Sequence, residues 1–238
     1  MSDGPTVVLV HGAWHNDTCW NLVRGLLDER GIPSVTVQLP QSTLDQDAAV
    51  VRTAIDEAPG DVIVVGHSWG GSPVTMGAAG SDKVRHLVYL AAFMVEIGLP
   101  VTEFETRHET TGAAAMVPEG DYMVIDPDLA VAAFYHDVEP GLAAETAAEL
   151  RPFELRGFQP VQTDLVAAWK TVPSTYVLTT DDRSVHPEDQ RIMARNATEV
   201  VEIPTGHSPF LSRPDLVADI VAERWERVRD ARGAAGRS

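Results

Sequence analysis

The sequence predicts an α/β fold, in which a parallel sheet of about six strands is covered by helices on both faces. Two observations favour it. Short apolar runs alternate with amphipathic stretches over residues 6–92, and the alternation resumes after residue 171. The pentapeptide GHSWG at 66–70 directly follows the apolar run DVIVV at 61–65. Alternating strands and helices favour parallel strands joined by right-handed crossovers.

The first half of the alternation is defined by apolar runs and turn residues. Strands are predicted at four runs rich in Val, Ile and Leu: 6–10, 32–39, 61–65 and 84–92. The helix after the first strand is expected to be capped by Asp17 or Thr18 and to end at Gly31. A second helix is predicted over 43–58, with Asp47 among the charged residues of its outer face.

The same rhythm returns in the C-terminal part of the chain. Two strands are predicted at 174–180 and 199–204, and two helices at 187–196 and from Pro214 onward. The tail over 230–238 is expected to fray, because terminal segments without apolar contacts are poorly ordered.

Residues 93–170 interrupt the alternation with several prolines, short helical patches at 130–134 and 143–150, and no convincing strand. A structureless loop of that length is uncommon inside a compact domain. The segment is therefore predicted to be a mostly helical cap, inserted over a core domain formed by 1–92 and 171–238. Several apolar cap residues are expected to line a pocket: Phe93, Met94, Phe104, Met116, Met123, Phe134 and Tyr135.

Charge and cysteine content restrict the possible partners. The chain of 238 residues carries 18 basic and 35 acidic residues, a net charge of −17. This balance disfavours binding to nucleic acids and to anionic membranes. The single cysteine, Cys19, excludes an internal disulfide and a multi-cysteine metal site, and is expected to be a small buried hydrophobe.

The N-terminal residues MSDGP have neither a basic patch nor an apolar signal segment. The most apolar later stretch, 87–100, is interrupted by Glu96 and is too short to span a bilayer. A cytoplasmic protein is therefore expected. Either a monomer or a homodimer is compatible with the sequence.

The pentapeptide at 66–70 has the pattern of a nucleophile elbow, a tight turn between a buried strand and a helix. Such a turn places the central Ser68 in a strained backbone conformation and leaves no room for side chains at Gly66 and Gly70. The strain lifts the serine hydroxyl above the sheet. The alternative interpretation is a glycine-rich turn without catalytic function.

A serine hydroxyl needs a base, and the base needs a carboxylate that orients it. Of the eight histidines, only His207 follows a late strand within a glycine-containing loop. Asp181 and Asp182 both follow the preceding strand, and the residues alone leave the choice between them open.

The remaining histidines receive other roles. His11 and His67 are expected to shape turns at strand ends, and His86 lies within a strand. The other histidines are expected on the surface or in the cap: His15, His108, His136 and His186.

Acyl transfer also needs an oxyanion hole, in which two backbone N–H groups face the developing negative charge. One donor is expected from Trp69, the residue after the serine. The other is expected from Ala13, because the sequence His11-Gly12-Ala13 after the first strand lets the backbone approach closely.

Five segments resemble one branch of the α/β-hydrolase superfamily: VLVHGAWH at 8–15, VVGHSWGG at 64–71, LVYLAAFM at 87–94, TTDDRSVHPEDQ at 179–190 and IPTGHSPFLSRP at 203–214. This branch contains plant methyl esterases of the salicylate-binding and methyl-jasmonate types, hydroxynitrile lyases and bacterial relatives. The resemblance covers nearly the whole chain except the cap. It implies the α/β-hydrolase fold and favours Asp182 as the acid.

Two departures from these relatives are informative. The resembling lyases carry a threonine after the first-strand histidine and a lysine after the catalytic histidine, where this chain has Gly12 and Ser208. Ester cleavage is therefore favoured over lyase chemistry. At Leu39-Pro40-Gln41-Ser42 the relatives usually have a glycine after the proline, a difference that carries no hint of the substrate.

The sequence thus predicts a serine hydrolase that cleaves a small carboxylic ester with Ser68, His207 and Asp182, without metal or organic cofactor. The expected partner is a small-molecule ester. A carbon–carbon lyase using the same triad, or a non-catalytic ligand-binding homologue, remain the alternatives.

Overall fold

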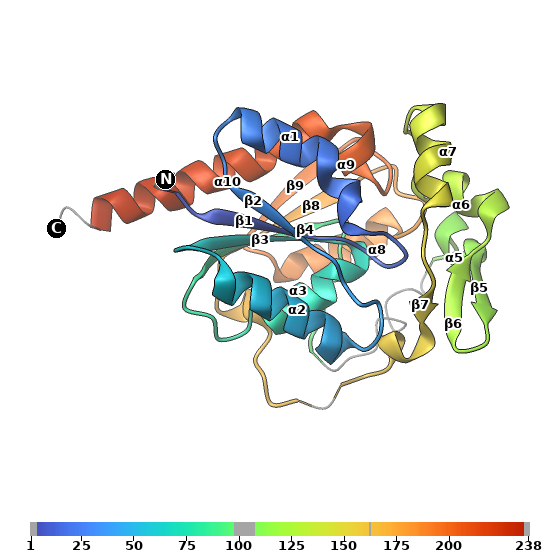
Figure 1. The fold of residues 1–238 in the computed structure, drawn as a ribbon, viewed down its shortest axis with the longest axis horizontal. Coiled ribbons are helices and arrows are strands. Elements are labelled where there is room, and N and C mark those ends of the chain that lie inside the picture. Colours follow the sequence, from blue (N-terminus) through green and yellow to red (C-terminus); the bar gives the residue numbers. More distant parts are fainter. Residues whose placement is uncertain (1–3, 98–107, 162, 236–238) are drawn as a thin grey trace.

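A six-stranded parallel sheet in the order β2-β1-β3-β4-β8-β9 forms the centre of the protein (Figure 1). The computed structural model describes residues 4–97, 108–161 and 163–235. The strands are β1 (Thr6–Val10), β2 (Ser34–Val37), β3 (Val62–His67), β4 (Val84–Leu90), β8 (Ser174–Thr179) and β9 (Glu199–Ile203). The predicted fold class is confirmed, and every predicted core strand is present with ends shifted by a few residues.

Helices cover both faces of this sheet (Figure 1). Helices α1 (Asn21–Glu29) and α10 (Pro214–Ala235) pack together on one face, and α2 (Leu44–Glu57) and α3 (Gly71–Gly77) on the other. Helix α8 (Pro187–Met193) joins β8 to β9, and the short α9 (Pro209–Ser212) precedes α10. Strands β1, β3 and β8 are buried along their whole length, as expected of strands covered on both sides.

The strand order reverses beside β1. The chain passes from β1 to the edge strand β2, and then returns to the other side of β1 with β3. Val10 at the end of β1 pairs with Gly66 near the end of β3, so the loops that follow these strands start side by side. Ligands of open α/β sheets bind at such a switch point, outside the carboxyl ends of the strands.

The part of the chain over 108–158, between β4 and β8, lies at one end of the sheet, opposite the chain termini (Figure 1). It contains the helices α5 (Thr111–Ala115), α6 (Pro127–Phe134) and α7 (Pro140–Ala148). It also contains a three-stranded antiparallel sheet of β5 (Met116–Glu119), β6 (Tyr122–Ile125) and β7 (Phe153–Glu154).

The expectation that residues 93–170 hold no strand was therefore wrong. The three strands have only two to four residues each, and none of them alternates regularly between buried and exposed residues. Glu119-Gly120-Asp121 turns the chain from β5 into β6, with Gly120 at φ 60°. Phe104, expected to line a pocket, lies outside the described residues.

Two expectations about helix ends were also wrong. Asn16, and neither Asp17 nor Thr18, is the capping residue, because its side chain accepts a hydrogen bond from Thr18 N at 3.0 Å and starts a 3-10 turn before α1. At the other end of the chain, α10 continues to Ala235, well into the tail expected to fray. One ion pair a helical turn apart, Arg227 with Glu223, stabilises the helix just before this tail, and Arg232 within the tail lies 4.0 Å from Asp61.

Two polar residues expected on the surface are buried, Asp47 of α2 and His15. Each is covered by residues from distant parts of the chain, which a helical or loop pattern cannot show. In the described part of the chain, no helix is both long and apolar enough to cross a membrane.

Candidate active site

Ser68 stands at the junction of β3 and the 3-10 turn Ser68–Gly70 that leads into α3. Its φ of 51° is a left-handed backbone conformation, which residues other than glycine rarely adopt. A Cβ added to Gly66 would lie 2.9 Å from the Gly70 carbonyl oxygen, and one added to Gly70 would lie 2.6 Å from that of His11. The turn is therefore closed to side chains on both sides of the serine.

His207 and Asp182 form a buried pair at the carboxyl end of the sheet. His207 Nδ1 donates to Asp182 Oδ2 at 2.8 Å, and both side chains are almost completely buried. Because the carboxylate takes the Nδ1 proton, the Nε2 lone pair of His207 is left to act as a base. The other predicted acid, Asp181, is mostly exposed and lies 3.6 Å from His136 Nε2.

Four further donors hold the Asp182 carboxylate. They are Thr179 Oγ1 at 2.8 Å and Gln190 Nε2 at 2.9 Å to Oδ2, and the backbone N–H groups of Ser184 at 2.7 Å and Val185 at 2.9 Å to Oδ1. With every neighbour donating, the carboxylate is fixed as an acceptor in one orientation. The sequence analysis missed Gln190, because a polar residue of an amphipathic helix is expected to face solvent.

The serine and histidine loops are joined through His67. Its Nε2–H donates to the backbone oxygen of His207 at 2.8 Å, and the two rings lie 4.7 Å apart. Among the residues that the structure describes, no hydrogen bond joins the Ser68 hydroxyl to His207. Such bonds are often long in enzymes without substrate and shorten in the complex.

Ala13 lies in the loop after β1, beside the same cavity as Ser68 and Trp69. Within the described chain its N–H has no hydrogen-bond acceptor, whereas its carbonyl accepts from His15 Nδ1 at 2.8 Å. The other ring nitrogen of His15 accepts from the Tyr135 hydroxyl at 2.9 Å. The loop that presents Ala13 is thus tied to helix α6, at whose end Tyr135 lies.

Three buried histidines surround this loop and the elbow. Burial lowers the pKa of His11 to about 3 and that of His15 to about 4, and it holds the pKa of His67 well below its usual range. All three are therefore neutral at pH 7, and none of the three adds a positive charge beside His207.

A small cavity lies beside Ser68. Among the residues that the structure describes, its lining contains no charged side chain: Ala13, Trp14, Ser68, Trp69, Phe93, Thr110, Ala113, Met116, Phe158, Ser184 and Val185. Phe93 and Met116 line it as the sequence predicted. Met94, Phe134 and Tyr135 are instead buried in the core, and Met123 is partly buried against it.

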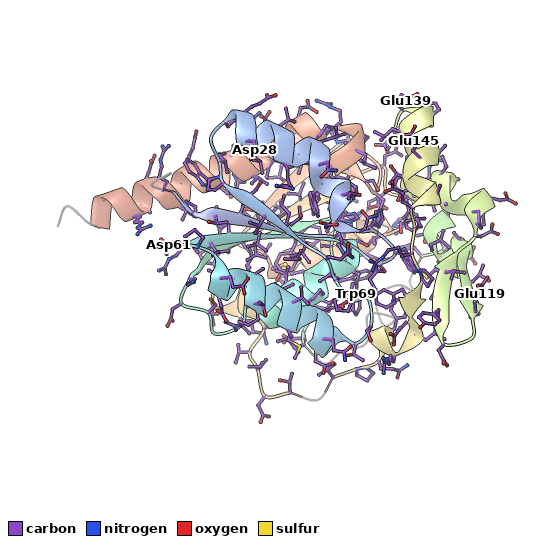
Figure 2. All side chains as sticks on the ribbon, viewed as in Figure 1. Asp28, Asp61, Trp69, Glu119, Glu139 and Glu145 are labelled. Carbon is purple, nitrogen blue, oxygen red and sulfur yellow. The ribbon has the colours of Figure 1, made fainter. Side chains whose placement is uncertain are left out.

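Trp69 lies between α2 and the segment of β5, β6 and β7 in the view of Figure 2. Its ring lies 5.1 Å from that of Phe153 in β7 and 5.8 Å from that of Phe158. Aromatic residues of the core and of the segment between β4 and β8 thus meet beside the cavity. Within the described ranges, no three His, Cys, Asp or Glu side chains converge in a way that could hold a metal ion.

Comparisons with known proteins agree with this architecture. A profile described as the alpha/beta hydrolase family matches residues 7–220. The chain is 30% identical to the alpha/beta hydrolase nvfD of Aspergillus novofumigatus, over 98% of this chain and 97% of that protein. It is 26% identical to methylesterase 2 of Arabidopsis thaliana, over 89% and 92% of the two chains.

A solved structure gives the same picture. The structure of the methylesterase MES16 from Arabidopsis matches with a TM-score of 0.75 and 25% identity, over 92% of this chain and 98% of the other. The resemblance to α/β hydrolases and to plant methylesterases, inferred from the sequence motifs, is confirmed.

Proposed function

The chain belongs to the alpha/beta hydrolase family, and from this premise we propose that it hydrolyses small, neutral carboxylic esters with a Ser68–His207–Asp182 triad. The observation that carries the proposal is the buried hydrogen bond of 2.8 Å between His207 Nδ1 and Asp182 Oδ2, at the sheet edge where the strained Ser68 lies. A histidine held in this tautomer is suited to take a proton from a serine hydroxyl.

The reaction would proceed in two halves. Ser68 Oγ attacks the acyl carbon while His207 Nε2 takes its proton, and the N–H groups of Ala13 and Trp69 stabilise the oxyanion. His207 then gives the proton to the leaving alcohol, and the C–O bond of the ester breaks to leave an acyl-enzyme. A water molecule, deprotonated by His207, attacks this acyl group and releases the acid and free Ser68.

The substrate class follows from the cavity. Because none of the described residues that line it is charged, a substrate with a carboxylate or an ammonium group near the ester would lose hydration without gaining a charged partner among them. The aromatic walls, including Trp14 and Phe158, favour an apolar acyl or alcohol group. The relatives named methylesterases, and the pyrethroid hydrolase of Sphingobium wenxiniae at 25% identity, support ester cleavage. Residues 93–170 are proposed to act as the cap over this cavity.

Gly12 argues against lyase chemistry. A Cβ at this position would lie 2.9 Å from both His67 Nδ1 and Ser68 Cβ, so no threonine fits there without displacing the elbow. Ser208, where the resembling lyases have lysine, is neutral and completely buried. Neither position supplies the groups that cyanohydrin cleavage would need.

Ser68→Ala tests the proposal. The purified variant should lose p-nitrophenyl ester hydrolysis by up to about 10⁶-fold, as in measured triad deletions. A fluorophosphonate reagent should label the wild type and Ser81→Ala, a control at the turn after α3, but not Ser68→Ala. Equal labelling of all three proteins, or undiminished hydrolysis by Ser68→Ala, would refute the assignment of the nucleophile.

A further inference from the structure

Asp47 links two segments that lie far apart in the sequence. Its carboxylate is completely buried in the first part of α2. Oδ2 accepts from the indole Nε1–H of Trp69 at 2.9 Å, and Oδ1 accepts from the backbone N–H of Gln41 at 2.9 Å. One carboxylate therefore holds the residue after the proposed nucleophile and the loop after β2.

The side chain of Gln41 extends this link to the loop after β1. Its Oε1 accepts from the backbone N–H of Trp14 at 2.6 Å, and its Nε2 donates to the carbonyl oxygen of His15. Both bonds are buried, and they flank the point where Ala13 enters the cavity. Because Gln41 accepts from the backbone N–H of Trp14, this N–H is not available to an oxyanion, which favours Ala13 as the donor of the loop.

Backbone strain is concentrated at both ends of the bond between Gln41 and Trp14. Gln41 has a φ of 58° and Trp14 a φ of 63°, two of the four positive values found at residues other than glycine in the described chain. Placing a residue other than glycine in the left-handed conformation costs on the order of 1 kcal/mol of free energy. The conformation therefore persists only where surrounding contacts enforce it. The side-chain amide of Gln41 supplies that enforcement.

We propose that Gln41 and Asp47 form a clamp that positions the two oxyanion donors, Ala13 N–H and Trp69 N–H, relative to each other. The inference rests on the proposed function, because it presumes that these donors act on an ester. Gln41 and Asp47 touch no reacting atom, so both are positioning residues. The Gln41–Asp47 clamp fixes direction as well as distance, which apolar packing between the same loops would not do.

Burial of the Asp47 carboxylate in this link costs free energy, because it removes an ionisable group from water. Burial raises the pKa of Asp47 to about 6, while the indole of Trp69, backbone N–H groups and the charge of Arg151 oppose the increase. A buried carboxylate stabilises a fold only when its oxygens are fully used. Here the oxygens are used by groups that belong to the catalytic end of the sheet.

The competing interpretation is purely structural: Asp47 would hold the chain entering α2, and Gln41 would only complete a buried network. The two interpretations differ in kinetics. A positioning role predicts a loss in kcat with little change in KM, since oxyanion stabilisation acts in the transition state. A structural role predicts a lower unfolding temperature and unchanged kinetics of the folded fraction.

Gln41→Gly separates the two interpretations, because it removes the amide and also relieves the strain at φ 58°. We expect kcat for a short aryl ester to fall about 10- to 100-fold, below the 10²–10³-fold loss of a whole oxyanion donor, with KM within about threefold. Gln46→Gly is the matched control. It makes the same change at an exposed position one residue before Asp47, and should keep wild-type kinetics despite its lower helix propensity.

Two further measurements keep the test decisive. If Gln41→Gly fails to fold, Gln41→Met serves in its place. It retains the length of the side chain without the amide and should show the same loss of kcat. The rate of fluorophosphonate labelling of Ser68 should fall in parallel with kcat. Since the two residues act as one unit, adding Asp47→Asn to Gln41→Gly should cost no more than the larger single loss.

Failure of the clamp and failure of the proposed function give different results. If the wild type is labelled and both Gln41 variants keep kcat and labelling rates within twofold of it, the clamp is refuted and the esterase stands. If the wild type is labelled but cleaves no ester, the substrate proposal fails and the labelling ratio still decides on the clamp. A wild type that is not labelled refutes both.

Discussion

Replacing Asp182 by Asn should invert the hydrogen bond that defines the tautomer of His207. Two backbone N–H groups, from Ser184 and Val185, point at Oδ1, so the oxygen of the new amide must stay at that position. The amide NH₂ then occupies the place of Oδ2 and faces His207 Nδ1. A donor at this place forces the ring proton to Nε2, where it blocks the base.

The neighbouring Gln190 cannot readily rotate to accept a hydrogen bond from the new amide group. Its Nε2 donates to the Oδ2 position at 2.9 Å and to the Val185 carbonyl at 2.8 Å, while its Oε1 accepts from Thr179 N at 3.1 Å. Rotating the amide of Gln190 to accept from the new NH₂ would break both of the latter bonds. The wrong tautomer is therefore the lower-energy state, and kcat should fall about 10⁴-fold, equivalent to about 5 kcal/mol.

The assay is p-nitrophenyl ester turnover of purified Asp182→Asn beside Asp181→Asn. The second variant makes the same chemical change in an exposed neighbour, and its kcat should remain within about threefold of the wild type. Unfolding curves of both variants would confirm that folded proteins are compared. A loss of less than about tenfold in Asp182→Asn, or a larger loss in Asp181→Asn, would refute this account of the acid.

Three further predictions concern stability and reaction class. The pKa values of His11 and His15 are lowered on folding, so their contribution to stability is present above pH 6.5 and is lost at lower pH. The raised pKa of Asp47 acts in the opposite direction. The lowered pKa values of His67 and His86 act in the same direction as those of His11 and His15. The free energy of unfolding should therefore fall by at least about 2 kcal/mol between pH 7 and pH 5, measurable by urea unfolding, and stability unchanged over this range would contradict these shifts. Tyr135→Phe removes the donor to His15 and should lower the free energy of unfolding by about 1–2 kcal/mol in chemical denaturation, and a neutral effect would show that this bond is not a net stabiliser. Mandelonitrile should release no cyanide above the uncatalysed rate, and measurable release would reinstate the lyase hypothesis.

The core strands were predictable because both faces of the sheet are covered. A strand buried on both sides must be a continuous apolar run, as in β1 and β3, and such a run stands out in any sequence. The antiparallel sheet of β5, β6 and β7 was not predictable in this way. Its strands have two to four residues each, β5 is largely exposed and contains Pro118, and neither continuous burial nor alternation marks the three strands.

Local sequence pattern does not determine which of the two adjacent aspartates contacts His207. Asp181 and Asp182 are chemically identical and share one turn after β8. Only the path of the backbone through that turn determines which side chain meets His207, and it turns Asp182 inward and leaves Asp181 exposed. The sequence motifs favoured Asp182 through their resemblance to a family, while the residues by themselves left both open.

The sequence by itself determined the α/β architecture, the elbow at Ser68 and the late loop of His207, because each depends on neighbouring residues and on strand order. The tertiary structure alone decided the roles of Gln41 and Asp47. Gln41 is a departure from related proteins without apparent meaning in the sequence, and Asp47 occupies a position on α2 expected to face solvent. Their partners, Trp14 and Trp69, lie 27 and 22 residues away. A polar side chain is buried only where such distant groups satisfy its hydrogen bonds, and this condition is met by the assembled fold and by no local pattern.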